Sequence, residues 1–404
     1  MESNYKRLGK YIREVNVRDT DKKVTLLLGV SIEKIFKPSI ANTIGTDMST
    51  YKIVKRNQFA YGPVTSRNGD KISIALLEDY DEAIVSQAYT PFEIIDTNEL
   101  LSEYLMMWFR RPEFDRYARF MSHGSAREIF GWEEMCDTEM PVPHPDKQRE
   151  IVKEYNTIVN RIKLNQQLIQ KLEETAQALY KEWFVDFEFP DENGKPYKSS
   201  GREMVFNEEL EMDIPKGWFL NKIGIFSKEV ITGKTPSTDD SENFGDFIPF
   251  VTIPDMHKKV FTLGSERSLS EKGANIQKNK TLPINSICVS CIGTAGLVVL
   301  TSEPCQTNQQ INSVICKDHI SPFYTFFLMR EVGEKIKGWG NTGSVAANVN
   351  KTDFSSIRIL IAREREINEF HKLISPLFDA IKNHQKQKLL LIETIRLINA
   401  KIST

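Results

Sequence analysis

An internal duplication constrains this chain more than any other feature of its sequence. Each half opens on a short amphipathic segment with a glycine at a matching place, Gly9 in the first half and Gly224 in the second. A strand introduced by an asparagine follows, at Asn57 and at Asn285. Order and spacing are kept while residue identity is mostly lost. We therefore predict two domains that share a backbone and differ in surface chemistry.

The later steps of the two halves keep the same order. The alternative is coincidence, because any two stretches of mixed helix and strand resemble each other to some extent in the order of their elements. The number of segments that recur in the same order favours duplication. The recurring segments are a strand with a polar pair (86–87 and 309–310), an aromatic-rich helix (104–109 and 323–328), a Gly-Ser loop (124–125 and 343–344) and a charged helix start (148–151 and 364–367).

A long heptad pattern follows each domain. Apolar or small residues recur in alternating steps of four and three from Ile151 to Trp183, and of three and four from Ile367 to Ile402. Each helix would have about 37 residues and a length of roughly 55 Å. Neither can bury such a stripe alone, so we predict that the two pack on each other, antiparallel; pairing between two chains is the alternative. The predicted core positions are Ile151, Ile158, Ile162, Ile169, Leu172, Leu179, Ile374, Leu377, Ile381, Leu391, Ile395 and Ile398.

Polar residues interrupt both stripes. Asn165, His384 and Lys388 occupy core positions, where polar groups fix the register of a helix pair at some cost in stability. Pro376 lies within the second helix, and we expect it to kink the helix or to break it near Ser375.

These patterns predict an α+β fold, with two pseudo-symmetric α+β domains separated by an antiparallel pair of long coiled-coil helices. The segment between the first helix and the second domain holds four basic and nine acidic residues and is rich in Pro, Gly and Ser. We interpret it as an acidic linker, whose negative charge should keep it away from any phosphate backbone. The predicted parts are a first domain (1–145), a first helix (146–185), the linker (186–216), a second domain (217–362) and a second helix (363–404).

Composition narrows the class of protein. The chain has 404 residues, 53 Lys and Arg against 55 Asp and Glu, and 40% hydrophobic residues, as in a soluble globular protein. No apolar run reaches the roughly 18 residues of a membrane span, and the first ten residues lack the apolar core of a signal peptide. With only five cysteines, we expect reduced thiols and a cytoplasmic location.

No motif assembles a recognisable active site. Gly233-Lys234-Thr235 lacks the glycine that a phosphate loop needs five positions earlier, and residues 338–343 match a dinucleotide fingerprint in the wrong context, after a helix, so we interpret them as a flexible loop. Cys288 and Cys291 should face opposite sides of one apolar strand, which favours buried thiols over a zinc site. We expect no catalytic residues and no metal; a methyltransferase or nuclease with an unfamiliar site is the weaker alternative.

The whole arrangement resembles the specificity subunit of type I restriction–modification systems, over nearly the full chain. The resemblance is carried by two variable α+β domains that are each followed by a long helix, and by several short segments. The segments are 222–226 with 233–237 at the opening of the second domain, 343–344 with 357–367 at its end, 141–151 at the end of the first domain, and 179–187 at the end of the first helix. The first domain departs from the family's pattern at its opening, because it lacks the Gly-x-Thr-Pro string that the second domain has.

The resemblance implies a non-catalytic subunit. Each target recognition domain would read one half of an asymmetric, bipartite DNA target, and the helix pair would set the spacing and dock two methyltransferase subunits. Motor-nuclease subunits would join for restriction. S-adenosylmethionine, ATP and Mg²⁺ would be held by these partners, with methyl transfer to an adenine N6. The rival interpretation of the residues is a two-lobed coiled-coil scaffold that binds proteins and not DNA.

Candidate DNA contacts follow from residue type and loop position. Arg, Lys, Asn and Gln read base edges, and Lys, Arg, Ser and Thr hold phosphates. Half-sites read from one face of B-DNA lie roughly 34 Å apart, and since neither domain is basic, we expect modest, salt-dependent affinity. Residues 86–87 and 309–310 we expect to be structural. The candidates are Arg67, Asn68, Lys71, Ser125 and Arg127 in the first domain, and Lys234, Thr235, Ser237, Thr238, Lys258, Lys259, Asn341, Thr342, Ser344 and Asn348 in the second.

Overall fold

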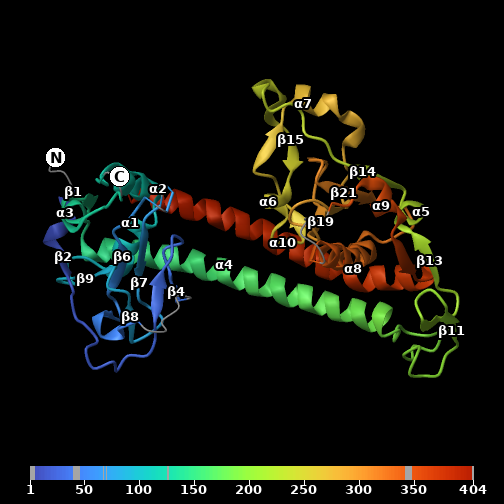
Figure 1. Cartoon of the computed structure of the whole chain (residues 1–404), viewed down its shortest axis with the longest axis horizontal. Coiled ribbons are helices and arrows are strands. Elements are labelled where there is room, and N and C mark those ends of the chain that lie inside the picture. The colour runs from blue at the N-terminus through green and yellow to red at the C-terminus, as the bar shows by residue number, and fades with distance from the viewer. Residues whose placement is uncertain are drawn as a thin grey trace. The chain divides into compact units, whose positions relative to one another are not determined.

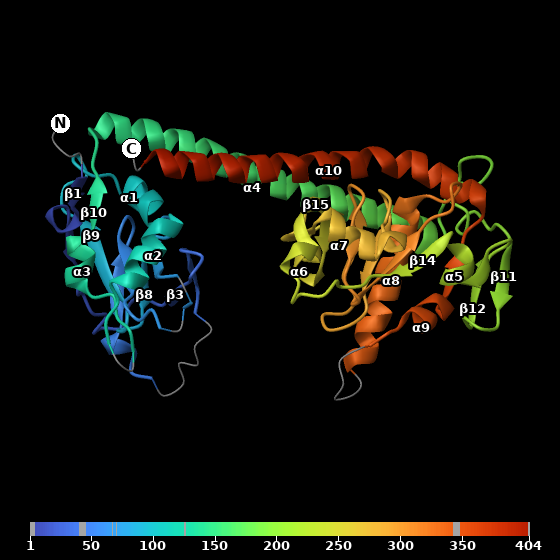
Figure 2. The ribbon, with the colours of Figure 1, turned by 90° about the horizontal axis from the view of Figure 1, so that it is seen from above.

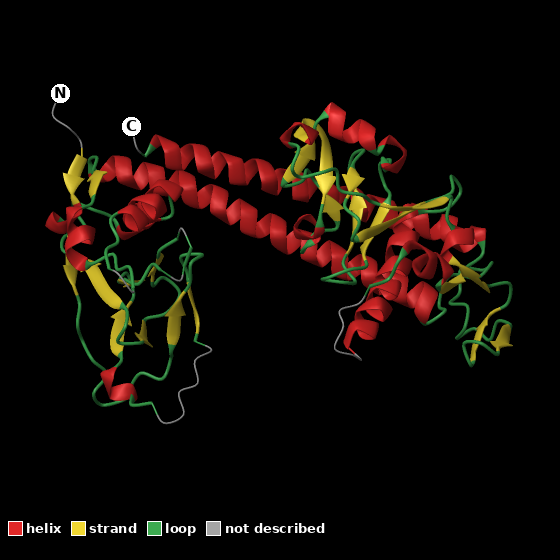
Figure 3. Cartoon of the chain, turned by 45° about the horizontal axis from the view of Figure 1, so that its top comes forward, coloured by secondary structure: helices red, strands yellow, loops and turns green. Residues whose placement is uncertain are grey.

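The computed structural model describes residues 5–39, 46–66, 68–69, 71–124, 127–341 and 348–402. The chain forms two compact units, one of residues 1–162 with 391–404 and one of residues 163–390. Each unit combines helices and strands in an α+β domain (Figure 3). The two long helices, green and red in Figure 1, each contribute one part to the first unit and the rest to the second.

The first domain is built around a four-stranded antiparallel sheet with the order β2-β9-β6-β7. Helix α1 covers this sheet with an almost fully buried apolar face, and Phe109 of α1 meets Phe59 and Phe92 of the sheet edge to face. The elements are β1 (Tyr5–Arg7), η1 (Leu8–Lys10), β2 (Ile12–Glu14), β3 (Leu28–Val30), β4 (Phe36–Pro38), η2 (Met48–Thr50), β5 (Lys52–Lys55), β6 (Phe59–Gly62), β7 (Ser73–Leu76), β8 (Glu82–Val85), β9 (Thr90–Ile94), α1 (Ser102–Phe109), α2 (Pro112–Phe120), α3 (Trp132–Asp137) and β10 (Glu139–Pro141).

The second domain has a five-stranded sheet, β14-β21-β18-β19-β16, and a smaller sheet, β17-β15-β20. Helix α8 packs on β18 and β19. The elements are β11 (Met204–Asn207), β12 (Met212–Pro215), β13 (Phe219–Lys222), α5 (Ile223–Phe226), β14 (Glu229–Thr232), η4 (Ser241–Asn243), β15 (Phe244–Val251), α6 (Ile253–Met256), β16 (Phe261–Thr262), β17 (Arg267–Leu269), α7 (Glu271–Ile276), η5 (Lys278–Lys280), β18 (Ile287–Ser290), β19 (Val298–Thr301), β20 (Gln306–Thr307), β21 (Ile311–Ile315), α8 (Pro322–Asn341), α9 (Lys351–Ser356) and β22 (Arg358–Ile361).

The two domains share one topology. The order β2-β9-β6-β7 recurs as β14-β21-β18-β19, and the pair β1–β10 recurs as β13–β22. Asn57 and Asn285, which introduce β6 and β18, both adopt the left-handed conformation, with φ of 65° and 63°. Asparagine tolerates that conformation better than other residues with a side chain. The duplication predicted from the order of segments is therefore present in the backbone.

The long helices α4 (Pro145–Tyr180) and α10 (Glu364–Lys401) pack antiparallel within each unit. In the first unit, Ile151 and Ile158 join Ile395 and Ile398 in one hydrophobic core. In the second unit, the Nδ1 of His384 lies 3.0 Å from the Oδ1 of Asn165. A turn of π-helix, η3 (Lys181–Val185), continues α4, and its Trp183 ring contacts the ring of Phe370. All twelve predicted core residues are buried or half-buried, so the helices pair within one chain.

Pro376 does not break α10, so the break near Ser375, one of the two outcomes expected, is absent. The helix runs without interruption through this residue. Proline cannot donate to the carbonyl of Lys372, but its ring is exposed, and the preceding Ser375 hydroxyl donates to the His371 carbonyl at 2.5 Å.

Two other expectations about loops are wrong. Residues 186–216 are not a plain linker, because β11 and β12 form a hairpin there and Phe189 stacks between Tyr197 and Trp218. Residues 338–341 of the supposed glycine loop form the last turn of α8. In contrast, Cys288 and Cys291 lie in different hydrophobic cores, as their opposite faces predicted.

Candidate nucleic-acid interface

Most of the sequence-predicted contacts that the structure describes lie at one end of each central sheet. We call this the loop end: the end at which β6 finishes and β9 begins in the first domain, and at which β18 finishes and β21 begins in the second. Figure 2 shows α8 running away from α10, so its C-terminal end lies on the side of the second domain remote from that helix.

In the first domain, two loops are joined at the loop end. Val64, just after β6, forms an isolated bridge with Ile129. The Thr65 amide donates to the Glu128 carbonyl at 3.0 Å, and its hydroxyl donates to the Ser122 hydroxyl at 2.8 Å. These bonds bring the β6–β7 turn, with Asn68 and Lys71, beside the segment that carries Arg127. Arg67 and Ser125 lie outside the described residues.

A buried ion pair is bonded to the end of the β6–β7 turn that leads into β7. The Lys34 ammonium lies 2.7 Å from the Asp115 carboxylate, and both side chains are nearly inaccessible to solvent. The same carboxylate accepts the amide of Ile72, the residue directly after Lys71, at 3.1 Å. Burial lowers the pKa of Lys34, and the Asp115 charge opposes that shift. The pair therefore anchors the point at which the turn enters β7.

The second domain repeats this arrangement with different side chains. Ile292, just after β18, bridges Asn348, as Val64 bridges Ile129. The Val349 amide donates to the Cys291 carbonyl at 3.1 Å, so Asn348 is held at the loop end. Asn341 is the last residue of α8; its side chain, Thr342 and Ser344 lie outside the described part of the chain.

The Gly-Lys-Thr-Pro segment also reaches the loop end. The Lys234 amide donates to the Thr307 carbonyl at 3.0 Å, and the Thr235 hydroxyl donates to Gln309 Oε1 at 2.6 Å. A Cβ on Gly233 would lie 2.2 Å from the carbonyl oxygens of Thr307 and Asn308, so only glycine permits this close approach. Gly233, which made this segment look like part of a phosphate loop, thus allows two backbone segments to pack closely.

Three lysines gather beside this segment. The Lys280 ammonium donates to the Thr232 carbonyl at 2.5 Å, and burial together with the charges of Lys351 and Lys234 lowers the pKa of Lys280. Within the described residues, none of these three ammonium groups has a carboxylate in ion-pair range. We call them the lysine cluster. Unneutralised positive charge of this kind attracts phosphate. Sequence reasoning missed Lys280 and Lys351, which are far from Lys234 in the chain.

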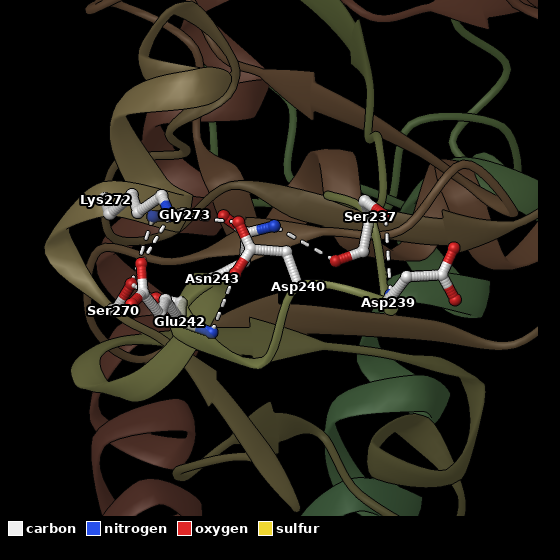
Figure 4. Close-up of polar contacts among 8 residues, drawn as sticks. All are labelled: Ser237, Asp239, Asp240, Glu242, Asn243, Ser270, Lys272 and Gly273. Carbon is white, nitrogen blue, oxygen red and sulfur yellow. Dashed lines mark hydrogen bonds and ion pairs between the residues drawn. The ribbon is translucent and has the colours of Figure 1, made fainter.

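Ser237 and Thr238 belong to a different environment. The Ser237 carbonyl accepts the Asn243 side-chain amide at 3.0 Å, and the Lys272 ammonium bridges Asp240 at 2.9 Å and Glu242 at 2.6 Å (Figure 4). These contacts fasten the loop after Thr238 to η4 and α7. The acidic neighbours make this region a poorer phosphate site than the lysine cluster.

Lys258 and Lys259 lie beside the long helices instead of at the loop end. They line a cavity of about 580 Å³, whose wall includes Gln166 and Gln170 of α4 and Arg330 of α8. The structure therefore separates these two candidates from the others.

The polar pairs of the repeat lie in turns, which corrects their assignment to strands. Residues 86–89 precede β9, and residues 308–310 precede β21. Gln87 and Gln309 are both exposed. Two of the predicted contacts are bonded at the second of these turns. The Thr235 hydroxyl donates to Gln309 Oε1, and the Lys234 amide donates to the carbonyl of Thr307, two residues before Gln309.

The model of the type I restriction modification DNA specificity domain matches this chain twice, over residues 21–174 and 215–393. The chain belongs to the family of type I restriction–modification DNA specificity subunits. It is 28% identical to the type I restriction enzyme HindI specificity subunit of Haemophilus influenzae, over 91% of this chain and 92% of that one. It is 26% identical to the MjaIX specificity subunit of Methanocaldococcus jannaschii, over 74% and 67%.

The fold of this specificity-subunit family member has a solved counterpart. The type I S subunit of M. genitalium superposes with a TM-score of 0.59 over 99% of this chain and 96% of that one, at 12% identity. Among the described residues, no group of three or more His, Cys, Asp and Glu side chains is placed to hold a metal ion. None of the described helices has the length and apolarity needed to cross a membrane.

Proposed function

We propose that this chain is the non-catalytic DNA-reading subunit of a type I restriction–modification complex, and that each domain reads one half of an asymmetric, bipartite target. One observation carries the proposal: the same sheet end in both domains gathers polar and basic side chains of different identity. A shared scaffold with different loop chemistry suits two readers of different sequences.

Charge supports this assignment for the second domain in particular. The lysine cluster has no carboxylate partner in the part of the chain that the structure describes, whereas the exposed lysines and arginines at other places are often paired with carboxylates. Phosphate contacts position a protein on the duplex and base contacts specify the sequence. We infer that the lysine cluster holds the DNA backbone beside the bases that the loop end of the second domain reads.

The helix pair is the proposed docking surface for two methyltransferase subunits. Exposed leucines outside the helix–helix core support this role, since they leave apolar surface uncovered: Leu164 is 45% exposed, and Leu397 is 66% exposed. The partners would hold S-adenosylmethionine and, with motor-nuclease subunits, ATP and Mg²⁺. This chain would supply sequence reading and spacing.

Footprinting on DNA tests the proposal. The chain, combined with its methyltransferase subunit, should protect two short blocks separated by an unprotected gap, and the two blocks should differ in sequence. Absence of protection on any DNA would favour a protein-binding scaffold. Methyl transfer by the purified chain alone would show that the subunit is an enzyme.

A further inference from the structure

The turn before the central strand is equivalent in the two domains. Phe59 of β6 pairs with Phe92 of β9, and Ile287 of β18 pairs with Val314 of β21. Because Asn57 and Asn285 precede these strands by the same number of residues, the register places Gln87 and Gln309 at the same structural position.

Both turns use the same hydrogen bonds. In the first domain the Ser86 hydroxyl accepts the Ala88 amide at 3.4 Å, and the Ser86 carbonyl accepts the Tyr89 amide at 3.0 Å. In the second, the Asn308 side chain accepts the Gln310 amide at 3.2 Å, and the Asn308 carbonyl accepts the Ile311 amide at 3.3 Å.

The residue before each glutamine therefore builds the turn. The glutamine side chain takes no part in these bonds and is exposed in both domains. A polar side chain that a fold places at the same position twice, and does not use to build the turn, is available for a ligand. The structure thus assigns the structural role to Ser86 and Asn308, and leaves the two glutamines for recognition.

Gln309 is also oriented by a neighbour. The Thr235 hydroxyl donates to its Oε1 at 2.6 Å, which leaves the second lone pair of that oxygen and both hydrogens of Nε2 for another partner. The main chain of Lys234, a member of the lysine cluster, is bonded to Thr307 close by. An amide that a neighbour orients, next to a phosphate-attracting surface, is an arrangement suited to base reading.

We propose that Gln309 and Gln87 are base-reading residues, one for each half-site, and that each recognises an adenine through its N6 and N7 atoms. An amide donates to N7 and accepts from N6 at once, which no other base edge in the major groove permits. Thr235 is a positioning residue for Gln309. This inference rests on the proposed function and adds to it the residues and the base class.

The test is selection of bound sequences from a randomised DNA pool, with the chain and its methyltransferase subunit assembled. Gln309→Ala should lower discrimination by roughly 5- to 150-fold at one position of one half-site. Gln309→Glu removes the donor and keeps the acceptors, so cytosine should replace adenine as the preferred base there. Gln87→Ala should affect one position of the other half-site alone.

Two further variants separate reading from structure. Thr235→Val should keep adenine as the preferred base and weaken the preference, because the glutamine is no longer oriented. Asn98→Ala, at an exposed amide that donates to Asp96 in the turn after β9, should leave the selected sequence unaltered. Thermal unfolding of each variant confirms that the domains are intact.

The outcomes are distinguishable. If the wild-type assembly selects a bipartite sequence and Gln309→Ala selects the same one with the same discrimination, the inference is wrong and the proposed function stands. Uniform loss of affinity across all sequences would make Gln309 a phosphate contact and would equally overturn base reading. If the wild-type assembly selects no sequence at all, the proposed function itself fails.

Discussion

At the scale of single residues, the shared framework is tightest where the opening segment of each domain meets a later helix. A Cβ on Gly9 would lie 2.8 Å from the Cβ of Cys136, and a Cβ on Gly224 would lie 3.2 Å from that of Ser355. We expect Gly9→Ala to lower the free energy of unfolding by about 1–3 kcal/mol through overpacking, and Gly224→Ala to lower it by less, because a smaller shift relieves the contact. Denaturant unfolding measures both.

Gly338 provides the matched control. It lies in α8 with open space where a Cβ would be. Gly338→Ala should be neutral or stabilise the helix by up to about 1 kcal/mol. A loss for Gly338→Ala as large as that for Gly9→Ala would show that the close approach at Gly9 is not the cause.

His371 should make the stability of the second unit depend on pH. Its Nδ1 lies 2.9 Å from the Ser321 hydroxyl and its ring stacks on Phe323, and burial lowers the pKa of His371 while the charge of Asp379 opposes the shift. The unfolded chain therefore binds the proton more readily. The stabilisation is complete above the ordinary pKa of about 6.5 and is lost as the pH falls below it.

Thermal midpoints between pH 7.5 and 5 measure this dependence. His371→Gln cannot be protonated and should flatten the profile, although it lowers the midpoint at neutral pH. His144→Gln, at an exposed position, should retain the wild-type slope. A His371→Gln profile as steep as that of the wild type would assign the acid sensitivity to other groups.

At the scale of elements, the polar contact inside the helix pair has a measurable cost. Asn165 is fully buried and bonded to His384 through Oδ1, while its Nδ2 has no partner among the described residues. We expect the double substitution Asn165→Leu with His384→Leu to raise the thermal midpoint. Asn165→Leu alone should gain less or lose stability, because it leaves the half-buried imidazole of His384 without its acceptor.

A double-mutant cycle gives the coupling between the two side chains, which should lie between about 0.5 and 3 kcal/mol for residues in contact. Thr157→Leu on the exposed face of α4 is the control and should be additive with His384→Leu. Additive effects for Asn165 and His384 would contradict a direct interaction between them.

The helix pair was predictable from the sequence because heptad spacing is a local property, and the same holds for Asn57 and Asn285, whose side chains suit a left-handed backbone. Contacts between distant residues were not predictable in this way. Lys280 and Lys351 join Lys234 only in the folded chain, where η5, α9 and the loop after β14 come together. The aromatic cluster that folds residues 186–216 is similarly spread along the chain, so composition alone suggested a linker.

At the scale of the whole molecule, the near-neutral chain should bind DNA through a few phosphate contacts. Lys234→Gln and Lys351→Gln should each reduce the slope of log K against log salt concentration by about 1, with similar losses on target and non-target DNA. Lys195→Gln, an exposed lysine in the acidic 186–216 segment, is the control. Binding titrations at several salt concentrations measure the slopes, and an unaltered slope for Lys351→Gln would place the lysine cluster away from the phosphates.

The proposed role of the helix pair in setting the spacing predicts the effect of lengthening it. Duplicating residues 162–168 of α4 together with the facing residues 381–387 of α10 preserves the heptad pattern and adds about 10.5 Å to each helix. At about 3.4 Å per base pair, the unread gap between the two half-sites should grow by about three base pairs, while both half-sites keep their sequence.

Binding to the longer target should also be weaker than wild-type binding, because three base pairs turn the duplex by about 100° and one half-site then faces away from its reader. Selection from a randomised pool measures both the gap and the affinity. Duplicating the heptad in α4 alone is the control: it leaves seven residues without a partner helix and should destabilise the protein without producing a new gap. A selected gap of the original length in the double duplication would show that the helices do not set the spacing.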